Sequence, residues 1–102
     1  MNKFDNDEDK FQVLRQIQKN PNSSQRQLAS DLGFSLGKLN YCVKELKQKG
    51  LIKINNFKKS KNKIKYLYIL TPKGIDYRIK LTVRFMKKKM EEYDNLKKEM
   101  KE

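Results

Sequence analysis

The chain has 102 residues, of which 36% are hydrophobic, and it carries a formal net charge of +13 with no histidine. This length supports one compact domain with a modest core, but not an interior that also encloses a deep catalytic cavity. The longest apolar run, residues 66–70, is far shorter than the ~18 residues of a membrane span, and the polar start lacks a signal-peptide core. A single cysteine, Cys42, excludes an internal disulfide and disfavours structural zinc. We expect a cytoplasmic protein without metal, cofactor or membrane contact.

Residues 1–6 are expected to form a flexible N-terminus, and a first helix is predicted over residues 7–20. Phe11, Leu14 and Ile17 recur three residues apart, which places them on one side of this helix. Its acidic first turn suits the positive end of the helix dipole. Pro21 ends the helix, because the residue before a proline is disfavoured in the helical region.

A second and a third helix follow with short connections. Ser24 is a suitable N-cap for the second helix, and Gln27 stands where it could complete a capping box. Gly33 supplies the left-handed turn after this helix. Ser35 caps the third helix, which is predicted to run to Lys49 and to stop at a glycine. Two helices joined by such a tight turn are typical of a helix-turn-helix unit.

The third helix has two distinct faces when it is rotated by 100° per residue. The apolar face is expected to pack on the first two helices and consists of Leu36, Leu39, Cys42, Val43 and Leu46. The face that points outward is polar and basic, and it suits the major groove of DNA. The candidate contacts on this helix are Ser35, Gly37, Lys38, Asn40, Tyr41 and Lys44. Solvation of these side chains is the alternative for each of them.

Each candidate on the third helix has a chemical role that fits its side chain. Asn40 can make a bidentate contact with adenine, and Lys38 or Lys44 can bind guanine. Tyr41 can contact a phosphate or a thymine methyl group, and Gly37 permits close approach of the helix to DNA. At the start of the second helix, Ser24 and Gln25 are expected to lie over a phosphate, since free backbone N–H groups favour an anion there.

Two strands are predicted next, over residues 51–55 and 64–70, joined by a long basic tip over residues 56–63. Residues 35–66 contain ten lysines and one acid, Glu45, and therefore hold +9 of the net charge. A genomic bias toward lysine codons explains single lysines but not this clustering, which favours a polyanionic partner. The tip is expected to contact the DNA backbone or minor groove. Its candidate residues are Lys58, Lys59, Ser60, Lys61, Asn62 and Lys63.

The last helix is predicted over residues 72–102, with Thr71 as N-cap and Pro72 at its first position. About 30 residues correspond to a length of about 45 Å, so half of the helix should protrude from the domain. Its apolar stripe predicts a two-fold homodimer that presents two recognition helices about 34 Å apart to an inverted repeat. A solvated helix folded back on its own domain is the alternative. The stripe consists of Ile75, Ile79, Val83, Met86, Met90, Tyr93, Leu96 and Met100.

The predicted fold is mainly α with a small β-hairpin, a winged helix-turn-helix of order α-α-α-β-β-α, with residues 7–71 as the DNA-binding domain and residues 72–102 as the dimerisation element. The residues Ser35–Cys42, Asn56–Lys58 and Tyr68–Ile75 resemble small MarR-family regulators associated with exopolysaccharide gene clusters. The resemblance starts near residue 10. It implies a bacterial-type transcriptional regulator with the helix after Ser35 as recognition helix and residues 56–63 as wing. Longer MarR proteins have extra terminal helices and often a ligand pocket, so no small-molecule ligand is expected here.

An enzyme is disfavoured, because the chain lacks histidine and a Gly-rich phosphate loop and its acidic residues are scattered. An RNA-binding protein would have similar charge, but it would more often present exposed aromatic residues on a sheet. A protein–protein adaptor that uses the last helix is a third possibility. Binding to duplex DNA, RNA and a non-cognate duplex at one salt concentration separates the three.

Overall fold

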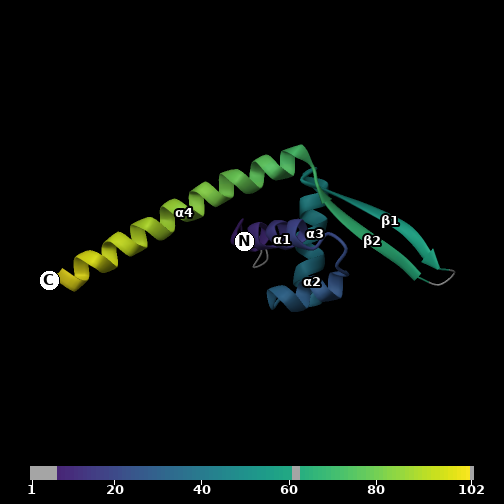
Figure 1. Ribbon diagram of the computed structural model, residues 1–102, viewed down its shortest axis with the longest axis horizontal. Coiled ribbons are helices and arrows are strands. Elements are labelled where there is room, and N and C mark those ends of the chain that lie inside the picture. Colours follow the sequence, from purple (N-terminus) through teal and green to yellow (C-terminus); the bar gives the residue numbers. More distant parts are fainter. Residues whose placement is uncertain (1–6, 61–62, 102) are drawn as a thin grey trace.

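The computed structural model describes residues 7–60 and 63–101, and for residues 56–60 and 63–66 it describes the backbone alone. In chain order the described residues form α1 (Asp7–Lys19), α2 (Gln25–Leu32), α3 (Leu36–Gln48), β1 (Ile52–Ser60), β2 (Lys63–Leu70) and α4 (Pro72–Lys101). Helices α1–α3 form a cluster from which the hairpin extends to one side and α4 to the other (Figure 1). This arrangement confirms the predicted winged helix-turn-helix fold with a long C-terminal helix.

Three helices begin at the N-caps that the sequence predicts, namely Ser24, Ser35 and Thr71. In each case the side-chain oxygen accepts a hydrogen bond from the backbone N–H three residues later, at 3.0–3.1 Å. The predicted capping box at α2 is not formed in full. The Gln27 side chain runs toward the next turn, where its amide donates to Asp31 Oδ1 at 2.8 Å. This bond to a charged carboxylate orients the Gln27 side chain away from the Ser24 backbone N–H, from which its amide oxygen would accept in a capping box.

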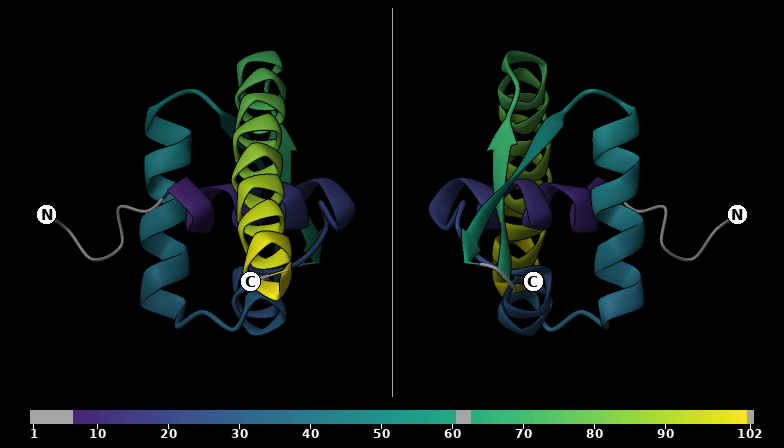
Figure 2. Two further views of the ribbon diagram at one scale, coloured as in Figure 1. Left: turned by 90° about the vertical axis from the view of Figure 1, so that its left-hand side faces the viewer. Right: turned by 90° about the vertical axis from the view of Figure 1, so that its right-hand side faces the viewer.

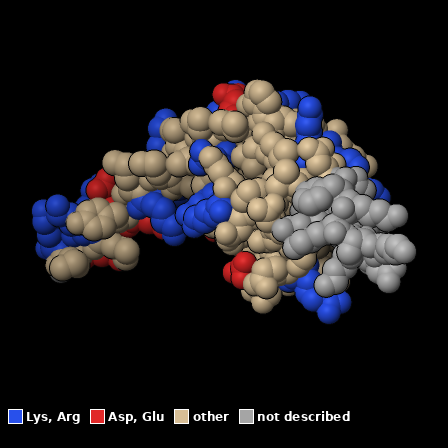
Figure 3. All heavy atoms as spheres, turned by 45° about the vertical axis from the view of Figure 1, so that its right-hand side comes forward, with Lys and Arg blue, Asp and Glu red and all other residues tan. Residues whose placement is uncertain are grey.

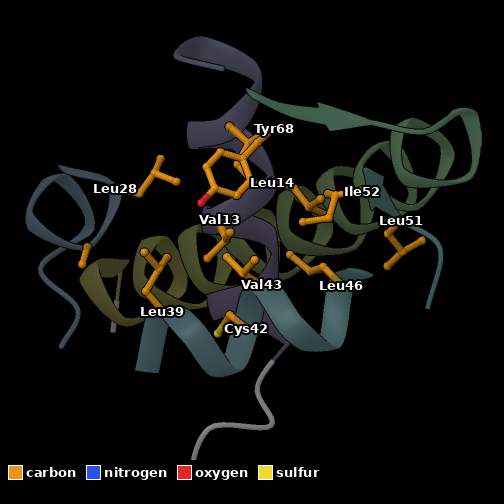
Figure 4. Packing of buried hydrophobic residues seen from close by; sticks show 12 residues of the cluster. Val13, Leu14, Leu28, Leu39, Cys42, Val43, Leu46, Leu51, Ile52 and Tyr68 are labelled. Atoms are coloured by element: carbon orange, nitrogen blue, oxygen red, sulfur yellow. The ribbon is translucent and has the colours of Figure 1, made fainter. Parts of the chain in front are cut away.

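The hydrophobic core lies where α1, α2, α3 and the base of the hairpin meet (Figure 4). Leu14 and Ile17 are almost completely buried and Phe11 is 9% exposed, as their spacing predicts. Tyr68 on β2 is also buried, which places its ring in the core and not on an open face of the hairpin. The members of the core cluster are Val13, Leu14, Ile17, Leu28, Ala29, Leu39, Cys42, Val43, Leu46, Leu51, Ile52 and Tyr68.

The hairpin is longer than predicted, because residues 56–60 and 63 belong to strands rather than to a loop. Strands β1 and β2 pair antiparallel from Ile52 opposite Leu70 to Lys58 opposite Ile64, with an irregularity before Ser60. The expected long tip is therefore wrong. In a two-stranded ribbon, backbone hydrogen bonds continue without a buried face, so polar composition does not stop the pairing.

The start of α4 is tied to the loop between α3 and β1. The Thr71 hydroxyl donates to the Gly50 carbonyl at 2.6 Å, and Lys73 Nζ donates to the Lys49 carbonyl at 3.1 Å. A Cβ atom built on Gly74 would collide with the backbone carbonyl of Leu51. Glycine is therefore required at this position for α4 to approach the chain so closely, a constraint that the sequence alone did not reveal.

The first half of α4 packs on α1, which lies between α4 and α3 (Figure 2). Leu81 is buried, and the rings of Phe85 and Phe11 have centroids 5.2 Å apart. From Met86 to Lys101 every residue is exposed. The described chain measures 66 × 28 × 27 Å. Protrusion of half of the helix is confirmed, and residues 86–101 do not fold back on their own domain.

Candidate nucleic-acid interface

Helix α3 presents one buried and one open face. Leu39, Cys42 and Leu46 are fully buried, and Val43 is 3% exposed. Leu36 was expected in this set, but the structure leaves it 44% exposed. It occupies the first position of the helix, where the core that α1 and α2 form no longer reaches it. An apolar side chain therefore joins the open surface at the start of α3.

Four residues of the open face were predicted from the sequence as candidate contacts. Asn40 and Lys44 are exposed and follow each other by one turn. Gly37 lies in the first turn, and a Cβ atom added there would meet nothing within 4 Å. Tyr41 is half-buried, and its hydroxyl donates to Glu45 Oε1 at 3.2 Å. The amide and the ammonium can thus meet another molecule, whereas the tyrosine hydroxyl is held along the helix.

Lys38 lies on the flank of α3 and turns toward α1 instead of outward. Its ammonium nitrogen is 3.1 Å from Asp9 Oδ2 and 4.1 Å from the centre of the Phe34 ring. The side chain of Lys38 is 27% exposed and that of Asp9 is 16% exposed. This lysine therefore bridges the start of α3 to the start of α1, and its charge is partly compensated.

The first turn of α2 is accessible to an anion. Ser24 is exposed and Gln25 is half-buried, and the backbone continues from the cap into the helix. Arg26, which was not among the predicted contacts, is exposed in the same turn. The sequence could have indicated this contact, because Arg26 is an isolated arginine in the first turn of the helix that precedes α3. Gly33 ends α2 with φ of 69° and thereby makes the tight turn into α3.

The wing candidates are placed by the backbone only. Lys58, Lys59 and Ser60 lie at the end of β1 and Lys63 begins β2, while Lys61 and Asn62 lie outside the described residues. At the base of the same hairpin, Lys53 and Asn55 are described and exposed. They place polar side chains on the described part of the hairpin.

The candidates for dimerisation form a continuous exposed stripe on α4. The eight predicted side chains are between 42% and 86% exposed, from Ile75 at 42% to Met100 at 86%. Except for Leu96, which lies about 20° from Phe85 around the helix axis at 100° per residue, they occupy a different side of the helix from Tyr77, Leu81 and Phe85, which face α1. Acidic and basic side chains are interspersed along the protruding end of α4 (Figure 3).

Burial raises the pKa of two ionisable side chains, Cys42 and Tyr77. Burial raises the pKa of the Cys42 thiol, and the nearby Asp9 carboxylate acts in the same direction. Burial and the Asp7 carboxylate, which accepts a hydrogen bond from the Tyr77 hydroxyl at 3.2 Å, raise the pKa of Tyr77. Within the part of the chain that the structure describes, no group of three His, Cys, Asp or Glu residues could hold a metal ion. Among residues 7–60 and 63–101, no helix has the length and hydrophobicity that crossing a bilayer requires.

Comparison with known proteins places the fold. Residues 7–53 match the model of a winged helix-turn-helix DNA-binding family. A comparison with curated proteins gives no match. Solved structures of bacterial regulators are similar to the chain along most of its length.

Three of these structures illustrate the similarity. The PcaV transcriptional regulator from Streptomyces coelicolor, in complex with its natural ligand, has a TM-score of 0.68 and 22% identity over 78% of this chain and 55% of its own. FabT from Streptococcus pneumoniae, in complex with DNA, has a TM-score of 0.62 and 23% identity over 85% of this chain and 59% of its own. A MarR protein from Peptoclostridium difficile has a TM-score of 0.63 and 20% identity over 80% of this chain and 52% of its own. The chain thus spans just over half the length of these structures.

Proposed function

We propose that the protein is a sequence-specific transcriptional regulator that binds double-stranded DNA through α3 and the hairpin. The observation that carries this proposal is the open polar face of α3, directly after the Gly33 turn of a helix-turn-helix. The match of residues 7–53 to a winged helix-turn-helix DNA-binding family supports it, as does the similarity to FabT, which is bound to DNA in its structure.

In this proposal α3 enters the major groove with its first turns against the base edges. The exposed Asn40 amide fits the N6 and N7 atoms of adenine, and Lys44 fits the acceptors of guanine. Gly37 allows close approach, and the exposed Leu36 supplies apolar contact. Lys38, on the flank and paired with Asp9, suits a phosphate better than a base.

Two further surfaces are proposed to contact the DNA backbone. At the start of α2, the backbone N–H groups near Ser24 and Gln25, together with the exposed Arg26, would bind one phosphate. The lysines of residues 58–63 would follow the backbone or the minor groove. These contacts would set the position of α3 in the groove without reading sequence themselves.

We further propose a two-fold homodimer through the stripe of α4, with the recognition helices about 34 Å apart on an inverted repeat. Its support is the exposure of all eight apolar side chains, including the adjacent Met86 and Met90, which are 58% and 63% exposed. An exposed apolar stripe of this length is costly in water and marks an interaction surface. Sedimentation at tens of micromolar tests it: a monomer would contradict the proposal.

The target genes follow from the resemblance alone. The similarity of Ser35–Cys42 to regulators of exopolysaccharide gene clusters supports genes of that class as targets. A cytoplasmic location is proposed with it, because action on chromosomal DNA would require one.

The decisive experiment is selection of binding sites by the purified protein from genomic DNA, followed by affinity measurements at one salt concentration. A preferred duplex should bind at least about 1,000-fold more tightly than a random duplex, as specific regulators do. Tighter binding to RNA of any sequence would favour an RNA-binding protein. If the protein binds neither nucleic acid, the result would favour a protein–protein adaptor that uses α4.

A further inference from the structure

We infer that the two copies of α4 pair antiparallel, in the register that places the two-fold axis between residues 87 and 88. The inference rests on the homodimer proposed above and specifies its geometry. It follows from three features of α4: the spacing of its apolar stripe, the charges beside that stripe, and the side that its own domain already covers.

When two copies of α4 run antiparallel, the apolar residues of one copy lie at the same levels as apolar residues of the other, or within one residue of them. In this register, Ile75 lies opposite the partner's Met100, and Ile79 lies opposite the partner's Leu96. Closer to the axis the match is offset by one residue. Val83 lies opposite the partner's Glu92, next to the partner's Tyr93, and Met86 lies opposite the partner's Lys89, next to the partner's Met90. Each of these side chains is exposed in the single chain. Reversal therefore matches the outer four residues of the stripe directly and brings an apolar partner within one residue of each of the inner four.

The charges beside the stripe are complementary in the same register. Asp76, Lys80, Asp94 and Lys98 lie on one flank, because each is turned by about 85–125° from the centre of the stripe at 100° per residue. When two helices related by a perpendicular two-fold axis pair antiparallel, this flank faces the same flank of the partner. Asp76 then lies one residue from the level of the partner's Lys98, and Lys80 lies one residue from the level of the partner's Asp94, which is within reach of these side chains. Such flanking pairs select orientation in coiled coils.

Asp76 and Lys80 can leave their ion pair within the chain and form ion pairs with the partner helix instead. In the single chain Lys80 Nζ lies 3.0 Å from Asp76 Oδ2, but the two side chains are 73% and 64% exposed. An exposed pair one turn apart on a helix contributes little to stability. Both groups can therefore change partners at small cost.

A parallel pair meets an obstacle that an antiparallel pair avoids. In a parallel pair, the charged flank would face the opposite flank of the partner helix, where Leu81 is buried and Phe85 packs on Phe11. The partner's domain already covers that side. In the antiparallel pair, the exposed residues 86–101 of each helix lie along the half of the partner helix that bears the domain. The uncovered end of one chain thus fits the stripe of the other.

Disulfide trapping tests the orientation in the full-length chain. In a Cys42→Ala background, Ile79→Cys and Leu96→Cys are made as separate variants, mixed in equal amounts and oxidised. A covalent heterodimer is expected in the mixture. Each variant alone should give none, since two copies of position 79 would be about 25 Å apart at 1.5 Å per residue, far beyond disulfide reach. Covalent dimers of Ile79→Cys with itself would overturn the register.

A second pair of variants tests the register even if the cysteine variants fail to dimerise. Lys80→Glu should weaken the dimer severalfold, and combination with Asp94→Lys should restore it. Failure of the double variant to recover would also overturn the register. Sedimentation of the unmodified chain separates the two proposals: a monomer contradicts the homodimer itself, whereas a dimer that traps position 79 to itself contradicts only the antiparallel arrangement.

Discussion

The ammonium group of Lys38 is held between the Asp9 carboxylate at 3.1 Å and the face of the Phe34 ring at 4.1 Å. Asp9 belongs to the first turn of α1, and Asp7 in the same turn makes an ion pair with Arg84 of α4 at 3.1 Å. One turn of α1 therefore contacts both the proposed recognition helix and the proposed dimerisation helix.

Replacement of Asp9 with Asn should release Lys38 and weaken sequence discrimination. Loss of this partly buried pair should lower the free energy of unfolding by about 1 kcal/mol. Once its charge is no longer shared with Asp9, Lys38 should neutralise its phosphate in full, so the slope of log K against log salt on random DNA should steepen by up to about 0.9. Asp31→Asn, which removes the same charge from α2, is the control. An unchanged slope on random DNA would show that Asp9 does not restrain this lysine.

Replacement of Asn40 with Ala should remove a base-specific contact. The cost should be about 1–3 kcal/mol on the preferred site and close to zero on random DNA. Gln48→Ala, an exposed change at the far end of α3, should affect neither. Fluorescence anisotropy on both duplexes measures the difference. An equal loss on the two duplexes would exclude Asn40 from base recognition.

Leu36 should pack against a thymine methyl group. Replacement of thymine by uracil at the contacted position removes only this methyl group, and it should cost the natural protein about 0.8 kcal/mol. The Leu36→Ala variant should bind the two sites equally. If uracil substitution at every thymine of the site leaves the affinity of the natural protein unchanged, the role assigned to Leu36 is wrong.

The lysines of the wing should supply affinity without specificity. Replacement of Lys58, Lys59, Lys61 and Lys63 with Gln should weaken binding to all sequences alike, and it should flatten the salt slope by about 0.9 for each phosphate that the wing no longer neutralises. The same four positions changed to Arg keep the charge and should keep the slope. Selective weakening on the preferred site would instead indicate base recognition by the wing.

Gly74 should be the glycine on which the fold depends. Gly74→Ala forces a methyl group onto the Leu51 carbonyl and should lower the free energy of unfolding by about 2–3 kcal/mol. In Gly37→Ala the added methyl group meets open space, so the free energy of unfolding should rise by about 0.5–1 kcal/mol. DNA binding should weaken, because the methyl group stands where the helix approaches the DNA. Urea denaturation of the two variants gives both values. Equal stability of Gly74→Ala and the natural chain would contradict the close approach.

Much of the fold and part of the site could be predicted from sequence because the responsible interactions are local. A cap such as Ser35 bonds to a backbone group three residues away, and the buried face of α3 follows from helical periodicity. The length of α4 and its apolar stripe are likewise properties of one continuous segment. Such features need no knowledge of what lies elsewhere in the chain.

Features that join residues far apart in sequence could not be predicted in this way. The surroundings of Leu36 and Lys38 depend on where α1 ends and on Asp9, which is 29 positions from Lys38 along the chain. The need for glycine at position 74 arises only when α4 approaches Leu51. Which helices form and which of their faces are apolar follows from the residues themselves, because hydrogen bonding and periodicity act within a few positions. Where those faces meet, and which charges they bring together, depends on packing between elements that are distant along the chain.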